Sequence, residues 1–317
     1  MEIDLMDEPG FRGHQLGFLD GLKGLGRSFN TIKNYRTDLE CFNRFIGSFR
    51  DTVGIRDFDI PLIEEYGAFL NNKYASDNSR RRRVQTLRMF CDYLTEKGIL
   101  SNNPVRKLRP SPKFQDIPRP APLMDVKTLW MHLIKEVKAT KALQQLMFKR
   151  NQIIFLLIFG GGLKVSDLEN LKINDIILED EPRVIITPPK RDPYSVPLPA
   201  IFRVVFNSYL ESLNALGWGQ NYLLFNANPY KILSGGISPR GLEKVFEEVR
   251  NKLLIGLTPK SLRQAAIFKW LHAGDSDGLI KEWMGVAPSY SLKGYKDFMD
   301  KHYYNEEFLV DLFQQQS

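Results

Sequence analysis

Two groups of residues in this sequence are of types that act on phosphates. The first lies between Leu257 and Tyr295. There, Arg263 stands one turn into an expected helix, and Tyr295 stands on a third short segment after a turn. A guanidinium can bind two phosphate oxygens at once, and a tyrosine hydroxyl can act as a nucleophile. The stretch is therefore a candidate site for binding or attacking a phosphate.

The second group is a cluster of arginines near the start of an expected helix. It consists of Arg80, Arg81, Arg82, Arg83 and Arg88. No acidic residue stands four positions after any of the four consecutive arginines, so local ion pairs do not account for them. Contact with the phosphates of a nucleic acid is the expected role, and a solvated charged turn is the alternative.

Composition sets the class of protein. The chain has 317 residues with 43% hydrophobic content, which is enough for two domains that each have a core. A net charge of +7 suits a polyanionic partner. Cys41 and Cys91 fall on apolar helix faces and are expected to be reduced core residues.

Metal, cofactor and membrane binding are not expected. No cysteine and histidine residues have zinc-ligand spacing, and the chain has only 4 histidines. The N-terminus lacks the features of a signal peptide, and the longest apolar run, residues 153–159, is too short to span a bilayer. We therefore expect a soluble protein in the cytoplasm.

The first domain is expected over residues 1–105 and should be helical. Residues 1 to about 28 are rich in glycine and are expected to form a mobile arm or a loosely packed segment. Helical periodicity begins near Thr31. A second helix follows the capping residue Asp59, and the helix with the arginine cluster stops at Gly98.

A linker is expected over residues 106–122. The sequence from 101 to 122 contains six prolines and five basic residues, and neither a helix nor a sheet tolerates that many prolines. Such a linker is extended and basic, so Lys107 and Arg109 are candidate phosphate contacts. The two domains would then close on a duplex like a clamp, and a plain tether is the alternative.

The second domain is expected over residues 123–317. Helices are expected near 125–138 and 143–159, followed by a short helix in LKVSDLENL. A β-hairpin of RVIIT and YSVPL follows, with Lys190 and Arg191 near its tip. Further helices are expected in IFRVVFNSYLESL and PRGLEKVFEEVRNKLL. The predicted fold class is therefore mainly α with a small β-hairpin sheet, in two domains.

Four blocks of this sequence resemble the tyrosine recombinases, the family of phage integrases and Xer proteins. FGGGLKVSDLENLKINDI is similar to the family's Thr-Gly-Leu-Arg-x-Ser-Glu-Leu motif, and IITPPKRDPYSVPLP to its lysine-bearing hairpin. LTPKSLRQA is similar to its Pro-His-x-Leu-Arg-His motif, and WMGVAPSYSLKGY to its Leu-Gly-His motif that ends in the nucleophilic tyrosine. The resemblance implies a helical core-binding domain followed by a catalytic-type domain.

The resemblance also implies a reaction. In the family a tyrosine attacks a DNA phosphodiester, two arginines bind its oxygens, a lysine protonates the leaving 5′-oxygen and histidines assist. Carried over to this chain, Tyr295 is the nucleophile, Arg263 the second arginine, and Lys190 or its neighbour Arg191 the lysine. The family's first arginine and its two histidine positions are replaced here by Lys164, Lys260 and Val286, respectively.

The three replacements weaken catalysis in different ways. Lys164 lacks the planar fork of an arginine, Lys260 is a poor base at neutral pH, and Val286 offers no hydrogen bond. Loss of one preorganised donor costs about 10²–10³ in rate. Two of the replacements are still cations, so phosphate binding would survive and strand cleavage would be lost. We therefore expect a DNA-binding protein that is not an enzyme, in which Tyr295 is structural.

A transcriptional regulator of a phage or mobile element is the function expected on this basis. In this role the chain resembles the repressors of this fold in SPβ-like prophages. An active recombinase that exchanges strands through a 3′-phosphotyrosine is the alternative, and an architectural partner of another recombinase is a third possibility. Double-stranded DNA is the expected partner. A homo-oligomer could form through an amphipathic C-terminal tail that contains Phe308, Leu309 and Leu312.

Overall fold

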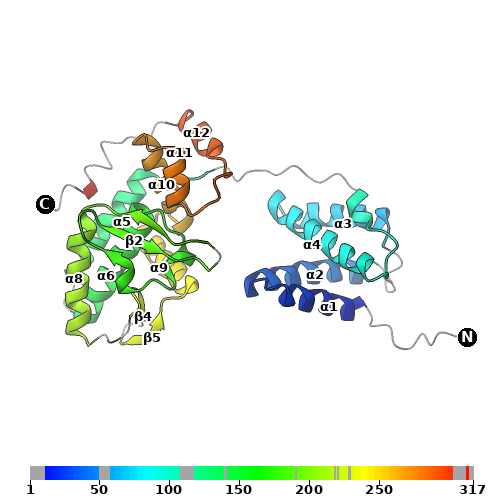
Figure 1. Ribbon diagram of the computed structural model, residues 1–317, viewed down its shortest axis with the longest axis horizontal. Coiled ribbons are helices and arrows are strands. Elements are labelled where there is room, and N and C mark those ends of the chain that lie inside the picture. Colours follow the sequence, from blue (N-terminus) through cyan, green and yellow to red (C-terminus); the bar gives the residue numbers. More distant parts are fainter. Residues whose placement is uncertain are drawn as a thin grey trace, which may run out of the picture. The chain divides into compact units, whose positions relative to one another are not determined.

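The computed structural model describes residues 11–49, 58–107, 118–138, 141–189, 191–217, 219, 221–227, 230–302 and 312–313. The chain divides into two compact units, Met1–Gln115 and Asp116–Ser317, hereafter unit 1 and unit 2. The described residues are mostly helical with small antiparallel sheets, so the predicted fold class is confirmed (Figure 1). Most of the predicted linker, 106–122, lies outside the described residues.

Unit 1 is helical throughout its described part. Its elements are α1 (Phe11–Gly24), α2 (Phe29–Phe49), α3 (Ile60–Lys73), α4 (Asp77–Glu96) and the 3₁₀ turn η2 (Pro104–Lys107). The predicted start of α3 is confirmed, since the Asp59 carboxylate accepts a hydrogen bond from the Leu62 N–H at 2.9 Å. Gly98, where α4 was predicted to stop, has φ of 72°, a conformation that favours glycine.

The expectation of a loosely packed N-terminal segment is wrong for its described part. Residues Phe11–Gly24 form α1, and Phe18, Leu19 and Leu22 are buried in the core of unit 1. The Phe18 ring centroid lies 5.6 Å from that of Phe90 on α4. Burial of these large apolar side chains outweighs the low helix propensity of the glycines between them. Residues 1–10 lie outside the described residues.

Unit 2 packs helices around two small sheets. Its elements are α5 (Leu123–Glu136), α6 (Ala142–Phe155), the π-helix η3 (Leu156–Gly160), α7 (Val165–Leu168), η4 (Ile173–Asp175), β1 (Ile176–Ile177), β2 (Arg183–Ile186), β3 (Tyr194–Pro197), α8 (Ile201–Ala215), β4 (Phe225–Ala227), β5 (Ile232–Gly236), α9 (Pro239–Leu253), α10 (Pro259–His272), α11 (Asp277–Trp283) and α12 (Lys293–Met299).

The predicted β-hairpin is confirmed and extended. β2 pairs with β3 in antiparallel register, with Val184 opposite Val196 and Ile186 opposite Tyr194. β1 adds a third strand on the other edge of β2. The β4–β5 pair was not predicted, because its strands are short and β5 is rich in glycine and serine.

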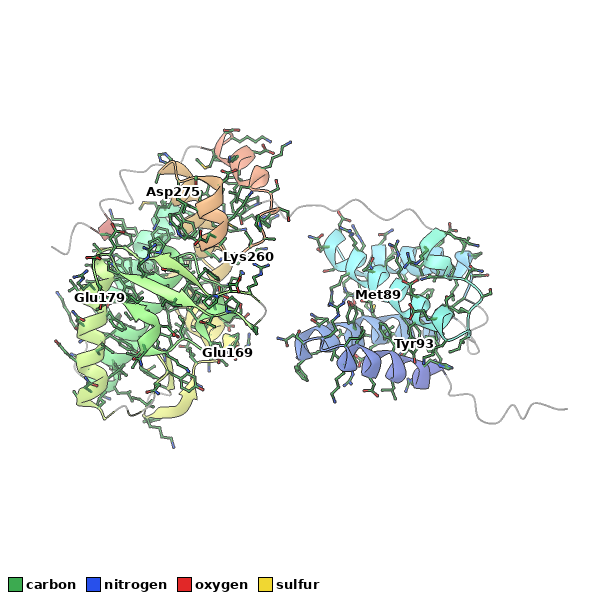
Figure 2. All side chains as sticks on the ribbon, in the orientation of Figure 1. Met89, Tyr93, Glu169, Glu179, Lys260 and Asp275 are labelled. Carbon is green, nitrogen blue, oxygen red and sulfur yellow. The ribbon has the colours of Figure 1, made fainter. Side chains whose placement is uncertain are left out.

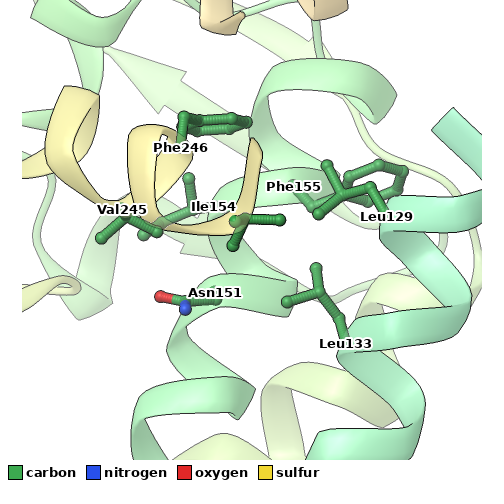
Figure 3. Close-up of a pocket in the computed structure, with 8 residues that line it drawn as sticks. Leu129, Leu133, Asn151, Ile154, Phe155, Val245 and Phe246 are labelled. Atoms are coloured by element: carbon green, nitrogen blue, oxygen red, sulfur yellow. The ribbon is translucent and has the colours of Figure 1, made fainter. Parts of the chain in front are cut away.

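The core of unit 2 lies where α5, α6 and α9 meet. Figure 3 shows apolar side chains from all three helices facing a common space: Leu129, Leu133, Ile154, Phe155, Val245 and Phe246. α6 continues without a break into the π-helix, and residues 152–160 are all buried, as the apolar run predicted. This packing fixes the position of the glycine-rich segment that follows the π-helix.

Residues 312 and 313 pack on unit 2 itself. Leu312 is buried, and the Phe313 ring centroid lies 6.0 Å from Trp130 and 6.2 Å from Phe159. The predicted role of the tail in oligomer formation receives no support from this arrangement, because Leu312 contacts its own unit. Phe308 and Leu309 lie outside the described residues.

Over the described ranges, every helix is too short or too polar to cross a lipid bilayer. In the same residues, no three histidine, cysteine, aspartate or glutamate side chains gather as a metal site would require. Cys41 and Cys91 are buried and carry free thiols, as predicted. Burial raises the pKa of the Cys91 thiol to about 12, so this thiol stays protonated at neutral pH.

Candidate functional site

Lys164 is positioned by the glycine run Gly160–Gly162. Gly162 has φ of 62°, and a Cβ atom there would lie 2.4 Å from the Trp270 ring of α10, so only glycine fits. The chain then enters α7, where the Lys164 N–H donates to the Asp167 carboxylate at 2.9 Å. The Lys164 Nζ atom donates to the Gly285 carbonyl oxygen at 3.3 Å.

Arg263 projects from α10 and joins two distant segments. α10 begins at a Thr258 cap followed by Pro259. Arg263 lies about one turn later, as the sequence predicted. Its Nε donates to the Gly162 carbonyl at 2.6 Å, and its Nη2 donates to the Met284 carbonyl at 2.9 Å. Burial lowers the pKa of this half-buried guanidinium from its usual value.

The turn after α11, Met284–Val286, gathers three cations. The Gly285 carbonyl accepts from Lys164 and also from Arg191 Nη1, at 2.7 Å. The Met284 carbonyl accepts from Arg263. We call Lys164, Arg191 and Arg263 the cation cluster. Carbonyls at the end of a helix carry partial negative charge, so the turn partly offsets the repulsion among the three side chains.

Repulsion within the cluster affects Lys164. Burial lowers the pKa of its amine, and the neighbouring charges of Arg263 and Arg191 lower it further, while Asp167 opposes them. A lysine of lowered pKa gives up its proton more readily than an exposed one. An anion bound here would offset the repulsion among the three cations and raise the pKa of Lys164 back toward its usual value. The cluster therefore has the electrostatics of an anion-binding site.

Tyr295 lies on α12 and is 7% exposed. Its ring centroid is 5.6 Å from that of Phe268, and its hydroxyl hydrogen-bonds with Tyr290 and Gln264. Burial raises the pKa of the Tyr295 hydroxyl to about 12, although the nearby charge of Arg263 lowers it. The hydroxyl is therefore protonated at neutral pH and lies within electrostatic reach of Arg263, one member of the cation cluster.

Gln264 connects Tyr295 to the end of the predicted linker. Its Oε1 accepts a hydrogen bond from the Arg119 N–H at 3.0 Å, which leaves its amide nitrogen as the donor toward Tyr295. The Ala121 N–H donates to the Ser261 carbonyl at 2.9 Å. The helix that carries Arg263 therefore also anchors the chain that enters unit 2.

The other predicted site residues lie apart from the cluster or outside the described residues. Lys260 is exposed on the first turn of α10 (Figure 2), where it lines a groove of about 440 Å³ with Arg240 and Arg250. Val286 is half-buried and packs against the core of unit 2. Lys190 lies outside the described residues, and its neighbour Arg191 is the hairpin residue that reaches the turn.

Tyr194 belongs to the site but was not predicted as a site residue. It is half-buried on β3, and a Cβ atom at Gly285 would lie 2.2 Å from its hydroxyl oxygen. Burial raises the pKa of Tyr194 to about 12, and the charges of Arg263 and Arg191 lower it. One signal could have found it, because Tyr194 shares a strand face with the buried Val196.

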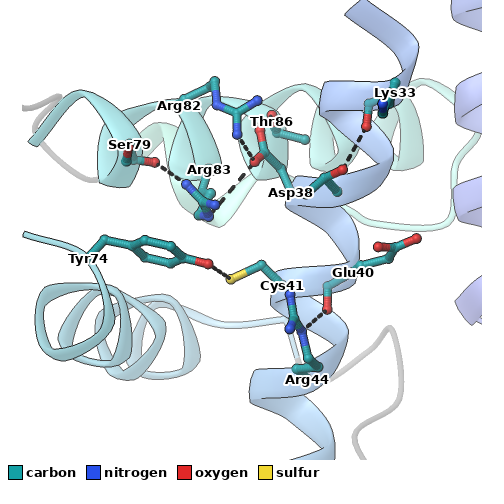
Figure 4. A network of polar contacts seen from close by, with 11 residues as sticks. Lys33, Asp38, Glu40, Cys41, Arg44, Tyr74, Ser79, Arg82, Arg83 and Thr86 are labelled. Carbon is teal, nitrogen blue, oxygen red and sulfur yellow. Dashed lines mark hydrogen bonds and ion pairs between the residues drawn. The ribbon is translucent and has the colours of Figure 1, made fainter. Parts of the chain in front are cut away.

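The arginine cluster of unit 1 is only partly open to solvent. Arg82 pairs with the buried Asp38 at 2.9 Å, and Arg83 is buried over the Tyr74 ring, 3.7 Å from its centroid (Figure 4). Arg80 pairs with Asp77. The expectation that local ion pairs do not account for these arginines is wrong for Arg80, which pairs with Asp77 three positions before it. Arg82 and Arg83 instead meet Asp38, which lies far away in the sequence.

Arg81 differs from its three neighbours. It makes no hydrogen bond or ion pair with any residue that the structure describes, and it lines an open groove with Asn78, Arg82 and Gln85. Arg88 is half-buried, Lys107 is exposed and Arg109 lies outside the described residues. Among the four consecutive arginines, Arg81 is thus the one without a hydrogen-bond or ion-pair partner among the described residues.

Comparison with known proteins identifies relatives for both units. The family described as the phage integrase SAM-like domain matches residues 18–110. Tyrosine recombinase XerC of Oceanobacillus iheyensis is 24% identical over 283 residues, which are 86% of this chain and 87% of that protein. XerC of Caldanaerobacter subterraneus is 33% identical over 178 residues, or 50% of this chain and 47% of that protein.

These relatives overturn one prediction. The sequence led us to expect a protein that is not an enzyme, yet the relatives that align over most of this chain are named as tyrosine recombinases, XerC and XerD. The matches point to an enzyme, so that expectation is wrong. It gave the three replaced side chains more weight than the rest of the sequence.

Solved structures of other proteins share the fold of this chain. The structure of a lambda integrase dimer bound to a core site matches with a TM-score of 0.69 at 14% identity, covering 94% of this chain and 99% of that one. XerH bound to its difH substrate matches with a TM-score of 0.63 at 16% identity, covering 90% and 78%. With the integrase-type match in unit 1, the XerC and XerD relatives over both units and this shared fold, the chain is similar to the tyrosine recombinases over most of its length.

Proposed function

We propose that this protein binds a specific duplex DNA site and cleaves and rejoins its strands with Tyr295 as the nucleophile. The observation that carries the proposal is the convergence of Lys164, Arg191 and Arg263 on the Met284–Val286 turn, with Tyr295 beside Arg263. Three cations gathered at one turn, with one of them beside a tyrosine hydroxyl, suit a reaction at a phosphodiester.

Binding of DNA is supported by charge and by the relatives. The net charge of +7 favours a polyanion, and the matching structures of lambda integrase and XerH are complexes with DNA. In unit 1 the proposed phosphate contacts are Arg81, Arg82, Arg88, Lys107 and Arg109. In unit 2 they are the cation cluster, Lys190 and Lys260. Arg80 and Arg83 instead support the helix that presents Arg81.

The proposed reaction exchanges one phosphodiester for another. The Tyr295 oxygen attacks the phosphorus atom and loses its proton, the bond from phosphorus to the 5′-oxygen breaks, and that oxygen takes up a proton. A 3′-phosphotyrosine results, and attack by a 5′-hydroxyl reverses the step. Because the pKa of Tyr295 is about 12, its proton must pass to a base as the bond forms.

The replaced residues change which side chains bind the phosphate and which one protonates the 5′-oxygen. Lys164 contributes charge without the fork of an arginine, and Arg191 brings a guanidinium to the same carbonyl. The lowered pKa of Lys164 makes it suited to protonating the 5′-oxygen, a role that Lys190 at the hairpin tip could share. Arg263 binds a non-bridging oxygen through the donors that face away from Gly162 and Met284.

Regulation of transcription from the bound site is a second candidate function. The observation that favours it is that two of the three replacements, Lys164 and Lys260, keep positive charge while losing arginine and histidine chemistry. Control of a promoter requires occupation of the site only, so it is compatible with cleavage there. A phage or mobile element is the proposed setting.

Tyr295→Phe tests the reaction. A site is first selected from random duplexes by affinity, and the full chain is then incubated with that duplex carrying a nick near the cleavage position. We expect a covalent protein–DNA adduct with the wild type and with Tyr230→Phe, an exposed tyrosine of unit 2, and none with Tyr295→Phe. A wild type that binds the site but never forms the adduct would rule out the proposed cleavage.

The same variant separates the two candidate functions. Tyr295→Phe keeps the cation cluster, so its DNA affinity should stay within about twofold of the wild type. A reporter gene downstream of the selected site measures regulation in cells. Equal control by the wild type and Tyr295→Phe supports a regulatory role that is independent of cleavage, and no control by either protein excludes it at that site.

A further inference from the structure

The site lacks a neutral hydrogen-bond donor at a position where one is expected. Val286 ends the turn that gathers the cation cluster, and its side chain packs against the core of unit 2. A valine cannot donate a hydrogen bond to a phosphate oxygen. The cluster supplies charge, so what is missing is a donor that does not add to the repulsion among Lys164, Arg191 and Arg263.

The Tyr194 hydroxyl occupies the space beside that turn. β3 runs next to α11, and the Tyr194 hydroxyl oxygen would lie 2.2 Å from a Cβ atom built on Gly285. The hydroxyl therefore lies against the residue whose carbonyl Lys164 and Arg191 bind. It reaches the turn from the sheet, whereas Val286 lies on the turn itself.

The hydroxyl is a donor without an established acceptor. Tyr194 forms no hydrogen bond with any residue that the structure describes, although its ring is half-buried. Burial raises its pKa to about 12, so it keeps its proton at neutral pH. The charges of Arg263 and Arg191 act on it, which places it within reach of an anion that those two residues would hold.

We propose that Tyr194 is a catalytic residue that donates a hydrogen bond to a non-bridging oxygen of the scissile phosphate, in place of the donor missing at Val286. This inference rests on the proposed function. Tyr194 keeps its proton throughout, and its hydrogen bond shortens as negative charge builds on the oxygen. Such a donor adds no charge to the cation cluster and strengthens binding of the transition state more than that of the substrate.

Tyr194→Phe tests this role because it removes the hydroxyl and leaves the ring that packs against Gly285. With the full chain and the selected nicked duplex, we expect the rate of adduct formation to fall about 10²-fold. The DNA affinity should change by less than about threefold. Tyr230→Phe serves as the matched control, and its adduct rate should equal that of the wild type.

A second substitution distinguishes a role of Tyr194 as a hydrogen-bond donor from a purely structural role. Val286→His places an imidazole on the turn, and in the Tyr194→Phe background it should recover at least about tenfold of the lost rate. A purely structural role for Tyr194 predicts no recovery, together with a lowered melting temperature for Tyr194→Phe, and that result would overturn the inference.

The two proposals can fail separately. A wild type that forms the adduct at the same rate as Tyr194→Phe overturns the role of Tyr194 and leaves cleavage by Tyr295 intact. A wild type that forms no adduct on a duplex it binds tightly overturns the cleavage proposal, and the role of Tyr194 with it.

Discussion

Gly285 leaves no room for a side chain. Its φ of 59° favours glycine, and a Cβ atom would meet the Tyr194 hydroxyl at 2.2 Å and the adjoining ring carbon at 2.7 Å. Both the left-handed backbone and the neighbouring ring thus exclude other residues. This accounts for the glycine between Met284 and Val286 without any appeal to a catalytic role for Gly285 itself.

Gly285→Ala should therefore destabilise unit 2 by about 2–4 kcal/mol, since αL strain and a forced shift of Tyr194 combine. Gly274→Ala is the control, because Gly274 also has a positive φ, 81°, but open space at its Cβ position. Its cost should be only about 1 kcal/mol. All 4 tryptophans lie in unit 2, so fluorescence during denaturation reports on that unit. Equal losses for the two variants would contradict the close contact with Tyr194.

Lys269 makes the stability of unit 2 depend on pH. Its Nζ donates to the Gly160 carbonyl at 3.2 Å, and burial lowers its pKa to about 8, against about 10.4 for an unfolded lysine. Between these values the unfolded chain binds more protons, so this residue's contribution to stability rises with pH. Below about pH 8 both states are protonated, and the cost of burying the charge is fully present.

Lys269→Met should remove that dependence. The free energy of unfolding of the wild type minus that of the variant is expected to rise between about pH 8 and pH 10, by at most about 1.4 kcal/mol per pH unit. The subtraction cancels other groups that titrate in this range, such as the Cys91 thiol. Tryptophan fluorescence in denaturant, measured at several pH values, gives both terms. A constant difference would show that Lys269 is not desolvated.

At the scale of elements, α10 and the glycine run depend on each other. Arg263 donates to the Gly162 carbonyl and Lys269 to the Gly160 carbonyl, so two cations of one helix bind the same short segment. A Cβ atom at Gly160 would lie 2.6 Å from Pro199, which follows β3. Helix, glycine run and hairpin therefore form one assembly that positions the cation cluster.

The elements that local sequence signals specify were predicted well. The cap and proline at the start of α3 and the alternation in β2 and β3 act within a few residues, and these elements form as expected. The glycines of α1 and the short strands β4 and β5 misled the prediction. There, packing against residues far away in the sequence outweighs local preference.

The candidate site was predicted only in part, for the same reason. Arg263 and Tyr295 could be identified because a family motif names their positions. The pairing of Asp38 with Arg82 and the approach of Tyr194 to Gly285 each join segments that no local pattern relates. Residue type indicates what Tyr194 can do, but only the fold brings its hydroxyl to the cluster.

At the scale of the whole molecule, neighbouring arginines of unit 1 should have opposite effects. Arg81→Ala removes a charge that has no partner among the described residues, so DNA affinity should fall and the slope of log affinity against log salt should decrease by about 1. Stability should change by less than about 0.5 kcal/mol. Titrations of the selected duplex at several salt concentrations measure the first effect, and circular dichroism during thermal unfolding measures the second.

Arg83→Met should do the reverse. Arg83 is buried against Tyr74 and lies near the buried Asp38, so its loss should destabilise unit 1 by about 1–3 kcal/mol. The salt slope of the variant should match that of the wild type wherever it is folded. A lowered slope with unchanged stability would mean that Arg83 contacts phosphate.

In the proposed reaction, an incoming phosphate has to replace the Gly285 carbonyl as the hydrogen-bond acceptor of Lys164 and Arg191. Lys164 and Arg191 already hold that backbone oxygen, so a phosphate does not meet donors that lack a partner but replaces one acceptor with a stronger, charged one. In the proposed reaction, the Gly285 carbonyl thereby takes the place of the phosphate and holds two like charges, Lys164 and Arg191, together while DNA is absent. When this carbonyl is displaced, the end of α11 loses two bonds. We expect the segment that leads to Tyr295 to gain freedom at that point, which suits the proposed attack of Tyr295 on the phosphorus atom.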